Sequence, residues 1–211
     1  KKSPTAHSQT VVTHVIMTRN TRTTKSLAEV NSALCKEWHP TKNGNLSPSD
    51  VSYGSGRKVW WKCPKGPDHE WEARIDKRNG TRGRGCPFCA NKRLSTTNNL
   101  AYLFPKIAEE WHPTKNGELT PEMVIAGGQT VYWFKCKVAD DHVWYSPLYA
   151  RIRGQGCPCC AGIQISKSNS LENVYPKITR EWHPTKNGNL SPSDVSYGSN
   201  RKVWWKCLKD S

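Results

Sequence analysis

Two matching sets of cysteine and histidine residues constrain this sequence more than any other feature. Cys63 is followed, after five intervening residues, by His69 and later by the Cys-x-x-Cys pair Cys86 and Cys89. The same order returns at Cys136, His142, Cys157 and Cys160, with the same five-residue gap. Four sulfur and nitrogen donors match the coordination number of a closed structural zinc site. The sequence therefore predicts two complete Zn²⁺ sites.

Disulfide bonds are the alternative use for the nine cysteines. Seven of them stand at repeated positions, and the Cys-x-x-Cys pairs accompany histidines, which is typical of metal sites. We therefore expect zinc. Because four protein ligands leave no coordination position open, we expect no catalysis at the metal and predict that the protein is not an enzyme.

The chain repeats itself from Ser26 onward. Trp38, Trp111 and Trp182 lie at the same place in each copy, 73 and 71 residues apart. We divide the chain into a basic arm (1–25), zinc-finger unit 1 (26–98), unit 2 (99–169) and an incomplete unit 3 (170–211). Unit 3 holds only Cys207 of its ligand set, so a third zinc site is incomplete in this sequence.

The composition favours small modules over one large core. Aliphatic residues are scarce, and the mean hydropathy of the 211 residues is -0.77. A chain of this length with so few aliphatics cannot bury one large core, whereas metal-stapled modules need little apolar surface. No apolar run approaches the roughly 20 residues that a membrane-spanning helix needs, so we expect no membrane contact.

Each unit shows the same order of expected elements. Apolar residues at helical spacing after Asn99 predict a short amphipathic helix that ends near Trp111. Residues 58–63 and 130–136 read as strands that end at the first cysteine ligand. A second strand follows, with Trp71, Ala73 and Ile75 on one face, and Trp144, Ser146 and Leu148 at the equivalent places. A Gly/Arg loop then leads to a Cys-Pro-x-Cys turn, which we expect to open a short helix.

The signatures E-W-H-P, W-x-C, H-x-W and G-C-P-x-C resemble those of tandem treble-clef, zinc-ribbon-like zinc fingers, from residue 26 to residue 207. The resemblance implies a fold class of small α+β metal-stapled modules, with a β-hairpin and a short helix in each unit. It also implies nucleic acid as the usual partner and, in some relatives, attachment to nuclease domains. The five-residue gap between Cys and His is longer than the two to four residues of ordinary zinc knuckles.

The remaining cysteines and histidines have other expected roles. Cys35 aligns with Ala108 and Thr179, and Cys159 aligns with Phe88, so neither cysteine is expected to be a shared ligand. Three histidines recur in the Trp-His-Pro segments: His39, His112 and His183. They could be alternative ligands, but three cysteines and a histidine already fill each complete site, and we expect them to pack.

The ten tryptophans have two possible uses, stacking on bases or building the cores. Those at repeated positions follow the core pattern, namely Trp38, Trp111, Trp182, Trp71 and Trp144. In the pairs Trp60-Trp61 and Trp204-Trp205, strand alternation is expected to bury one residue and to leave the other outward. The outward one is a candidate for stacking on a base or packing on a partner.

The charge distribution predicts a polyanionic partner. The formal net charge is +15, and two Cys3His sites with zinc would lower it to about +13. Basic residues gather around the glycines of the Gly/Arg loops, where guanidinium groups and backbone amides can reach phosphates. The predicted nucleic-acid contacts are Arg74, Lys77, Arg78, Arg82, Arg84, Lys92, Arg93, Arg151, Arg153 and Lys167. A solvated mobile loop is the alternative.

The function that fits these features is non-catalytic nucleic-acid binding, with RNA preferred over DNA. No helix carries a pattern for reading base edges, so backbone and shape recognition of structured RNA is the expected mode. Several modules on one chain would act as a clamp. The alternatives are a DNA-targeting module of a nuclease and a zinc-stabilised protein-interaction scaffold.

The first 25 residues bear on the compartment. They are rich in Lys, Arg, Ser and Thr and contain no Asp or Glu, as in an organellar presequence or the region just after one. This predicts a mitochondrion or plastid, and a component of an organellar ribosome or another ribonucleoprotein with further protein partners. A disordered basic arm of a nuclear protein is the alternative.

Overall fold

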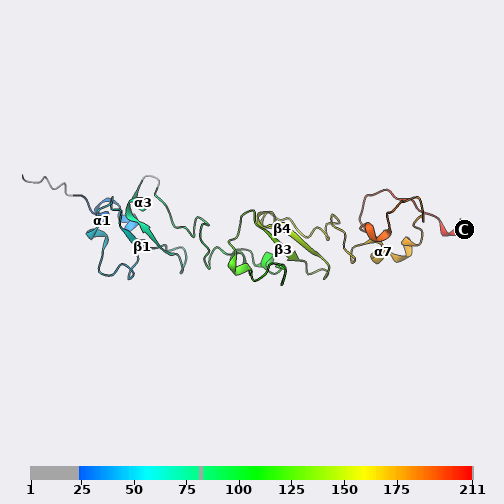
Figure 1. Cartoon of the computed structure of the whole chain (residues 1–211), viewed down its shortest axis with the longest axis horizontal. Helices are drawn as coiled ribbons and strands as arrows, with labels where there is room; N and C mark the ends of the chain where they lie inside the picture. Colours follow the sequence, from blue (N-terminus) through cyan, green and yellow to red (C-terminus); the bar gives the residue numbers. More distant parts are fainter. Residues whose placement is uncertain (1–23, 81–82, 211) are drawn as a thin grey trace, which may run out of the picture.

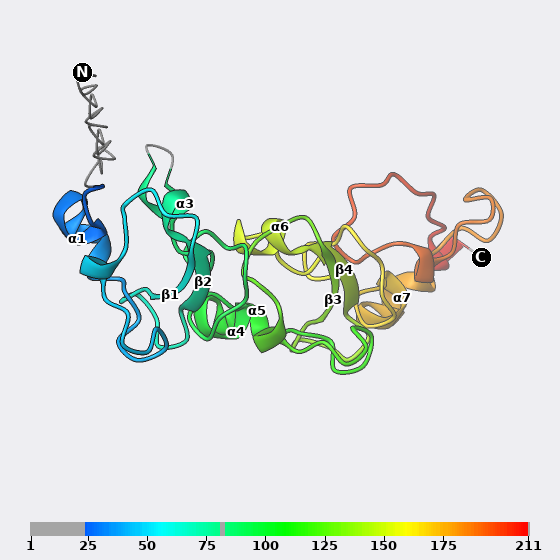
Figure 2. The same ribbon diagram turned by 60° about the vertical axis from the view of Figure 1, so that its left-hand side comes forward.

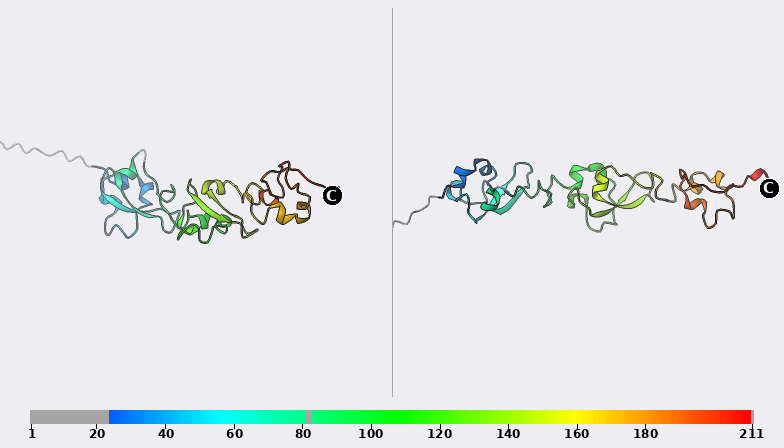
Figure 3. Two further views of the ribbon diagram at one scale, coloured as in Figure 1. Left: turned by 45° about the vertical axis from the view of Figure 1, so that its right-hand side comes forward. Right: turned by 90° about the horizontal axis from the view of Figure 1, so that it is seen from above.

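The computed structural model describes residues 24–80 and 83–210. Figure 1 shows the three units following one another along the longest axis of the chain, and the views in Figures 2 and 3 show the same serial order. The expected basic arm lies outside the described residues except for Thr24 and Lys25. Within the described ranges, none of the helices has the length and apolar character needed to cross a bilayer.

A two-stranded antiparallel hairpin forms the centre of units 1 and 2. The strands are β1 (Lys58–Lys62) and β2 (Glu70–Arg74) in unit 1, and β3 (Val131–Lys135) and β4 (Val143–Pro147) in unit 2. The E-W-H-P segment pairs with the free edge of the first strand, where Lys62 N donates to Glu37 O at 2.7 Å. The predicted strands are therefore confirmed. In each hairpin, the E-W-H-P segment also forms an isolated antiparallel bridge with the first strand.

The inner face of each hairpin forms the core of its unit. Trp61 and Trp71 face each other in the register of unit 1, and Phe134 and Trp144 do so in unit 2. All four side chains are buried. Because successive side chains of a strand point to opposite faces, Trp60 is only half-buried on the outer face. The expectation that one residue of the Trp60-Trp61 pair is buried is confirmed.

Unit 3 differs at the same place. Trp204 is 58% exposed and Trp205 is 42% exposed. Trp205 still forms an isolated antiparallel bridge with Trp182, but no strand of the described residues packs beside it as β2 packs beside β1. The expectation that one of these two residues is buried was therefore wrong for unit 3.

Each unit opens with two short helices in place of the single predicted one. They are α1 (Leu27–Val30), α2 (Ser32–Cys35), α4 (Leu100–Leu103), α5 (Pro105–Ala108), α7 (Leu171–Val174) and α8 (Pro176–Thr179). Asn99 caps α4 as predicted, since its side chain accepts from Tyr102 N at 2.8 Å. The helix breaks at Phe104, whose φ of -136° and ψ of 63° are not helical. The following Pro105 disfavours the helical conformation of the residue before it.

The sequence did not predict the helices that follow the hairpins, α3 (Ile75–Asn79) and α6 (Leu148–Ile152). These residues were expected to continue the second strand into the Gly/Arg loop. The Cys-Pro-x-Cys segments, in contrast, form a hydrogen-bonded turn and no helix, with Ala90 N donating to Cys86 O at 3.1 Å. The remaining elements are the 3-10 helices η1 (Pro48–Asp50), η2 (Pro121–Met123), η3 (Pro192–Asp194) and η4 (Leu208–Asp210).

Candidate metal centres

Four donor atoms meet at one end of the unit 1 hairpin. Cys63 follows β1 directly, His69 precedes β2, and the turn after α3 supplies Cys86 and Cys89. The sulfur atoms of Cys63 and Cys89 are 3.7 Å apart. His69 Nδ1 lies 3.7 Å from the sulfur of Cys86 and 3.6 Å from that of Cys89. All four donor atoms lie within 4.8 Å of one another.

Unit 2 repeats this arrangement. The sulfur atoms of Cys136 and Cys160 are 3.6 Å apart. His142 Nδ1 lies 3.8 Å from the sulfur of Cys157 and 3.4 Å from that of Cys160. A tetrahedral zinc ion, with bonds of about 2.3 Å to sulfur and about 2.0 Å to nitrogen, holds its ligands about 3.5–3.8 Å apart. Both donor sets therefore fit one Zn²⁺ each.

The second nitrogen of each histidine is held by a hydroxyl group. His69 Nε2 lies 2.9 Å from Thr97 Oγ1 and 3.1 Å from Ser95 Oγ. His142 Nε2 lies 3.0 Å from Ser168 Oγ, which donates to Asp141 Oδ1 at 2.6 Å. With zinc bound at Nδ1, Nε2 would carry the ring proton and would donate a hydrogen bond to the hydroxyl group. Partners of this kind fix the ring of a metal ligand and its tautomer.

The thiols of Cys89 and Cys160 need a nearby cation to ionise at neutral pH. Burial raises the pKa of the Cys89 thiol to about 12, and the thiols of Cys63 and Cys86 beside it add to the shift. Burial likewise raises the pKa of the Cys160 thiol to about 12, again with help from the two neighbouring thiols. Zinc binds the thiolate, so it must displace these protons. The bound ion would then connect hairpin and turn.

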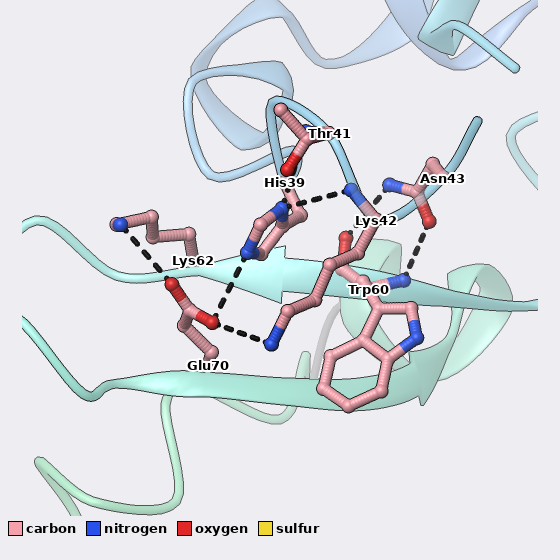
Figure 4. Close-up of polar contacts among 7 residues, drawn as sticks. All are labelled: His39, Thr41, Lys42, Asn43, Trp60, Lys62 and Glu70. Carbon is pink, nitrogen blue, oxygen red and sulfur yellow. Dashed lines mark hydrogen bonds and ion pairs between the residues drawn. The ribbon is translucent and has the colours of Figure 1, made fainter. Parts of the chain in front are cut away.

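The recurring histidines of the Trp-His-Pro segments hold a turn and lie outside both donor clusters. His39 Nδ1 accepts the backbone N–H groups of Thr41 at 3.3 Å and Lys42 at 3.1 Å. Its Nε2 lies 3.2 Å from Glu70 Oε2, as Figure 4 shows. His112 and His183 accept the equivalent pairs of N–H groups. These contacts use the nitrogen lone pair that a metal would need, which supports the expected packing role.

The other cysteines of the described residues are not members of the two donor sets. Cys35 is half-buried, and its thiol donates to Asn31 O at 3.2 Å. Cys159 is 1% exposed, and burial together with Cys157 raises the pKa of its thiol to about 11. A buried thiol that keeps its proton is chemically inert. Cys207 in unit 3 is exposed.

Two arginines that the sequence assigned to nucleic acid lie in the cores instead. Arg78 is 7% exposed; it donates to Glu37 Oε2 at 2.6 Å and to Arg84 O at 2.7 Å. Its guanidinium lies 4.9 Å from the centroid of the Trp61 ring. Arg151 is equally buried and donates to Glu110 and to the Gln155 carbonyl.

This burial corrects the prediction for Arg78 and Arg151. The sequence showed them as part of a basic loop, but helices α3 and α6 turn them inward, between the hairpin and the E-W-H-P segment. There each one neutralises a glutamate and packs on aromatic rings. Neither guanidinium is available to a phosphate.

The other predicted contacts are exposed wherever the structure describes them. They are Arg74, Lys77, Arg84, Lys92, Arg93, Arg153 and Lys167. Arg82 lies outside the described residues. Arg74 is already engaged, because its guanidinium pairs with both oxygens of Asp76 at 3.0 and 2.7 Å.

Three of these residues share one groove beside the zinc cluster of unit 1. Arg84, Lys92 and Arg93 line a cavity of about 480 Å³, together with Glu72 and Pro87 among others. The positions equivalent to the three basic residues in unit 2 are Gln155, Ile163 and Gln164. The basic groove is therefore a property of unit 1.

A comparison with known families agrees with these observations. Three regions, residues 34–92, 107–163 and 178–211, match a family described as the probable treble clef zinc finger domain. A search of curated proteins finds no match. The matched regions cover well over half of the chain and include both Cys/His clusters. The chain therefore belongs to this family of probable treble clef zinc finger domains.

Proposed function

We propose that this protein is a non-catalytic nucleic-acid-binding protein that clamps structured RNA through its phosphate backbone. The observation that carries the proposal is the groove of about 480 Å³ in unit 1, with Arg84, Lys92 and Arg93 on its wall. The zinc cluster fixes this wall, because Cys86 and Cys89 lie between Arg84 and Lys92 in the chain.

The three basic side chains of the groove are free to meet an anion. All three are exposed, and none forms an ion pair with a described residue. Arginine can take two phosphate oxygens at once, and lysine acts as a compact point charge. Gly83 and Gly85 flank Arg84, so the backbone can also approach a phosphate closely. Such contacts hold a backbone without reading its sequence.

Structured RNA fits this surface better than a base-read DNA site. The longest helices of the described residues have five residues, too few to present several side chains along a major groove. Double-stranded RNA is recognised mainly by shape and by its backbone. We extend the proposal to a ribonucleoprotein of a mitochondrion or plastid, on the composition of residues 1–25. Crosslinking in cells, with sequencing of the recovered nucleic acid, tests that extension.

The salt dependence of binding tests the groove directly. The variant with Arg84→Gln, Lys92→Gln and Arg93→Gln should bind an RNA hairpin more weakly than the parent. The slope of log K against log salt concentration should become shallower by roughly 2–3. Arg74→Gln is the matched control, because Asp76 already occupies that guanidinium. An unchanged slope in the triple variant would contradict the proposal.

A protein-interaction scaffold is the second candidate, and it is favoured by one feature of unit 2. Ile163 is 81% exposed and Val138 is 74% exposed, both close in sequence to zinc-cluster residues. Exposed apolar side chains of this kind are typical of protein contacts when they are contiguous. Recovery of a protein, with no RNA, after crosslinking through residue 163 would favour this candidate.

A further inference from the structure

The outer face of the unit 2 hairpin carries an aromatic pair. Trp133 on β3 and Tyr145 on β4 are partners in the antiparallel register. Their ring centroids lie 5.2 Å apart at an interplanar angle of 66°, so the rings meet edge to face. Trp133 is half-buried, whereas Tyr145 is 66% exposed. The Tyr145 ring is therefore in contact with the Trp133 ring and is also open to solvent.

A lysine from a neighbouring turn joins this pair. Lys115 Nζ lies 4.3 Å from the centroid of the Trp133 ring. The turn is fixed in place, because Lys115 N donates to His112 Nδ1 at 3.2 Å. The Asn116 side chain also accepts from Trp133 N and donates to Trp133 O, each at 2.9 Å. The cation and the aromatic rings therefore keep a defined geometry.

Unit 1 contains the same turn and strand, but there the carboxylate of Glu70 pairs with the lysine, as Figure 4 shows. Lys42 Nζ lies 4.5 Å from the centroid of the Trp60 ring and 2.7 Å from Glu70 Oε2. Glu72 is exposed opposite Trp60 in the register. The outer face of unit 1 thus presents two carboxylates beside its tryptophan, which disfavour a phosphate.

Unit 2 replaces both carboxylates. Val143 stands at the position of Glu70, and Tyr145 stands at the position of Glu72. As a result, Lys115 forms no ion pair with a described residue. Burial lowers the pKa of His112, and the nearby charges of Lys115 and Lys135 lower it further. Of these two lysines, Lys135 forms an ion pair with Asp140 at 2.7 Å. This face offers an aromatic ring and a free cation, which complement a base and a phosphate.

We propose that Lys115, Trp133 and Tyr145 form a binding site for one unpaired nucleotide of an RNA strand. The open face of Tyr145 stacks on the base, Trp133 supports the tyrosine ring, and the Lys115 ammonium meets a phosphate of the same strand. Because every base has a π face, the site tolerates any sequence. The inference rests on the proposed function. It adds a contact with a single-stranded nucleotide in unit 2 to the contacts of the unit 1 groove with the RNA phosphate backbone.

Two RNA probes and a matched pair of variants test the site. The probes are a short unstructured RNA and a blunt hairpin duplex, each titrated into the full zinc-loaded chain. Tyr145→Ala should weaken binding of the unstructured RNA about five- to tenfold and change duplex binding by less than about twofold. Tyr145→Phe should retain binding, because the ring remains. Tyr102→Ala removes a tyrosine that is 63% exposed and lies outside both proposed sites, so it should weaken neither probe.

The possible outcomes separate this inference from the proposed function. Equal binding of the unstructured RNA by the parent and Tyr145→Ala overturns the nucleotide site, while the arginine and lysine variants of unit 1 still report on the groove. Failure of the parent chain to bind either probe overturns both proposals. A loss of zinc or of the near-UV circular dichroism signal in Tyr145→Ala would indicate misfolding. In that case Lys115→Gln, whose backbone contacts are unchanged, must show the same selective loss or the inference fails.

Discussion

Arg78 and Arg151 show how a charged residue acts as a core residue in these small units. Each guanidinium lies over the rings of two aromatic residues and donates to a glutamate of the E-W-H-P segment. Modules with few aliphatic residues gain packing area from the flat guanidinium as well as charge pairing. Removing such a group leaves a carboxylate without its partner inside the fold.

We expect Arg78→Gln to destabilise unit 1. The variant loses a charged hydrogen bond to Glu37 and the contact with Trp61 and Trp71, so the free energy of unfolding should fall by about 1.5–3 kcal/mol. Urea denaturation of the zinc-loaded protein measures the change. Arg74→Gln removes an exposed ion pair, so it should lower the free energy of unfolding much less than Arg78→Gln does. Equal effects of the two variants would show that Arg78 is not a core residue.

Zinc loading should release protons. With the pKa of Cys89 and Cys160 raised to about 12, these thiols are protonated at neutral pH in the metal-free chain. Because zinc binds cysteine as the thiolate, each site should release at least the proton of Cys89 or Cys160 when it takes up zinc. Because protons and zinc compete for the thiolates, zinc affinity should fall as the pH is lowered. A pH indicator in weak buffer counts the protons, and release of none would contradict thiolate ligation.

At the scale of elements, a buried asparagine connects each zinc turn to the next unit. Asn98 Nδ2 donates to Phe88 O at 2.9 Å and to Arg93 O at 2.8 Å, and its Oδ1 accepts from Ser95 N at 2.7 Å. The backbone carbonyl of Asn98 accepts a hydrogen bond from Ala126 N of unit 2 at 2.9 Å. Asn169 holds the turn of unit 2 in the same way. One residue therefore closes the turn that carries two ligands.

Asn98→Ala should loosen the zinc turn of unit 1. Three side-chain hydrogen bonds are lost, two of them buried and one partly buried. Each is worth about 1 kcal/mol, and the carbonyls of Phe88 and Arg93 lose a donor. We expect faster loss of zinc to a chelator from unit 1, while unit 2 keeps its rate. Asn169→Ala should show the reverse. The two sites are distinguished by hydrogen exchange at residues 86–94 and 157–165, and equal acceleration at both would argue against a local effect.

At the scale of the whole molecule, each zinc site is connected to the segment that enters the following unit. The hydroxyl groups that hold His69 belong to Ser95 and Thr97, and the one that holds His142 belongs to Ser168. These residues lie just before Leu100 and Leu171, where the next units begin their first helices. Zinc in one unit should therefore help to fix the next unit in the serial arrangement of Figure 1.

Loss of one zinc site should free the junction that follows it. In Cys86→Ser, hydrogen exchange should increase at residues 95–99, while residues 166–170 stay protected. In Cys157→Ser the pattern should be reversed. Small-angle scattering should show a broader distribution of chain dimensions in either variant.

A strong chelator should unfold both complete units, since structural zinc supplies about 10–16 kcal/mol to small fingers. Retention of the native spectrum in the chelator would rule out structural zinc.

The sequence by itself determined the metal centres and the repeat, because both are encoded by residues at short, fixed spacing. A Cys-x-x-Cys turn brings its sulfurs together locally, and a hairpin register brings Cys63 and His69 to one end. Alternation along β1 likewise predicted that one residue of the Trp60-Trp61 pair is buried, although it did not predict that this residue is Trp61. Pro105 also explains the break between α4 and α5 at Phe104. We did not predict this break, because the apolar residues on both sides of it keep helical spacing.

Only the tertiary structure decided which charges are free. Arg78 and Arg84 look alike in the sequence, but helix α3 turns Arg78 toward Glu37, 41 residues away, and leaves Arg84 in the groove. Lys42 and Lys115 occupy identical turns, and their difference comes from Glu70 and Val143 on the second strand of each hairpin. Charge pairing depends on contacts between residues distant in the chain, and local spacing carries no information about those contacts.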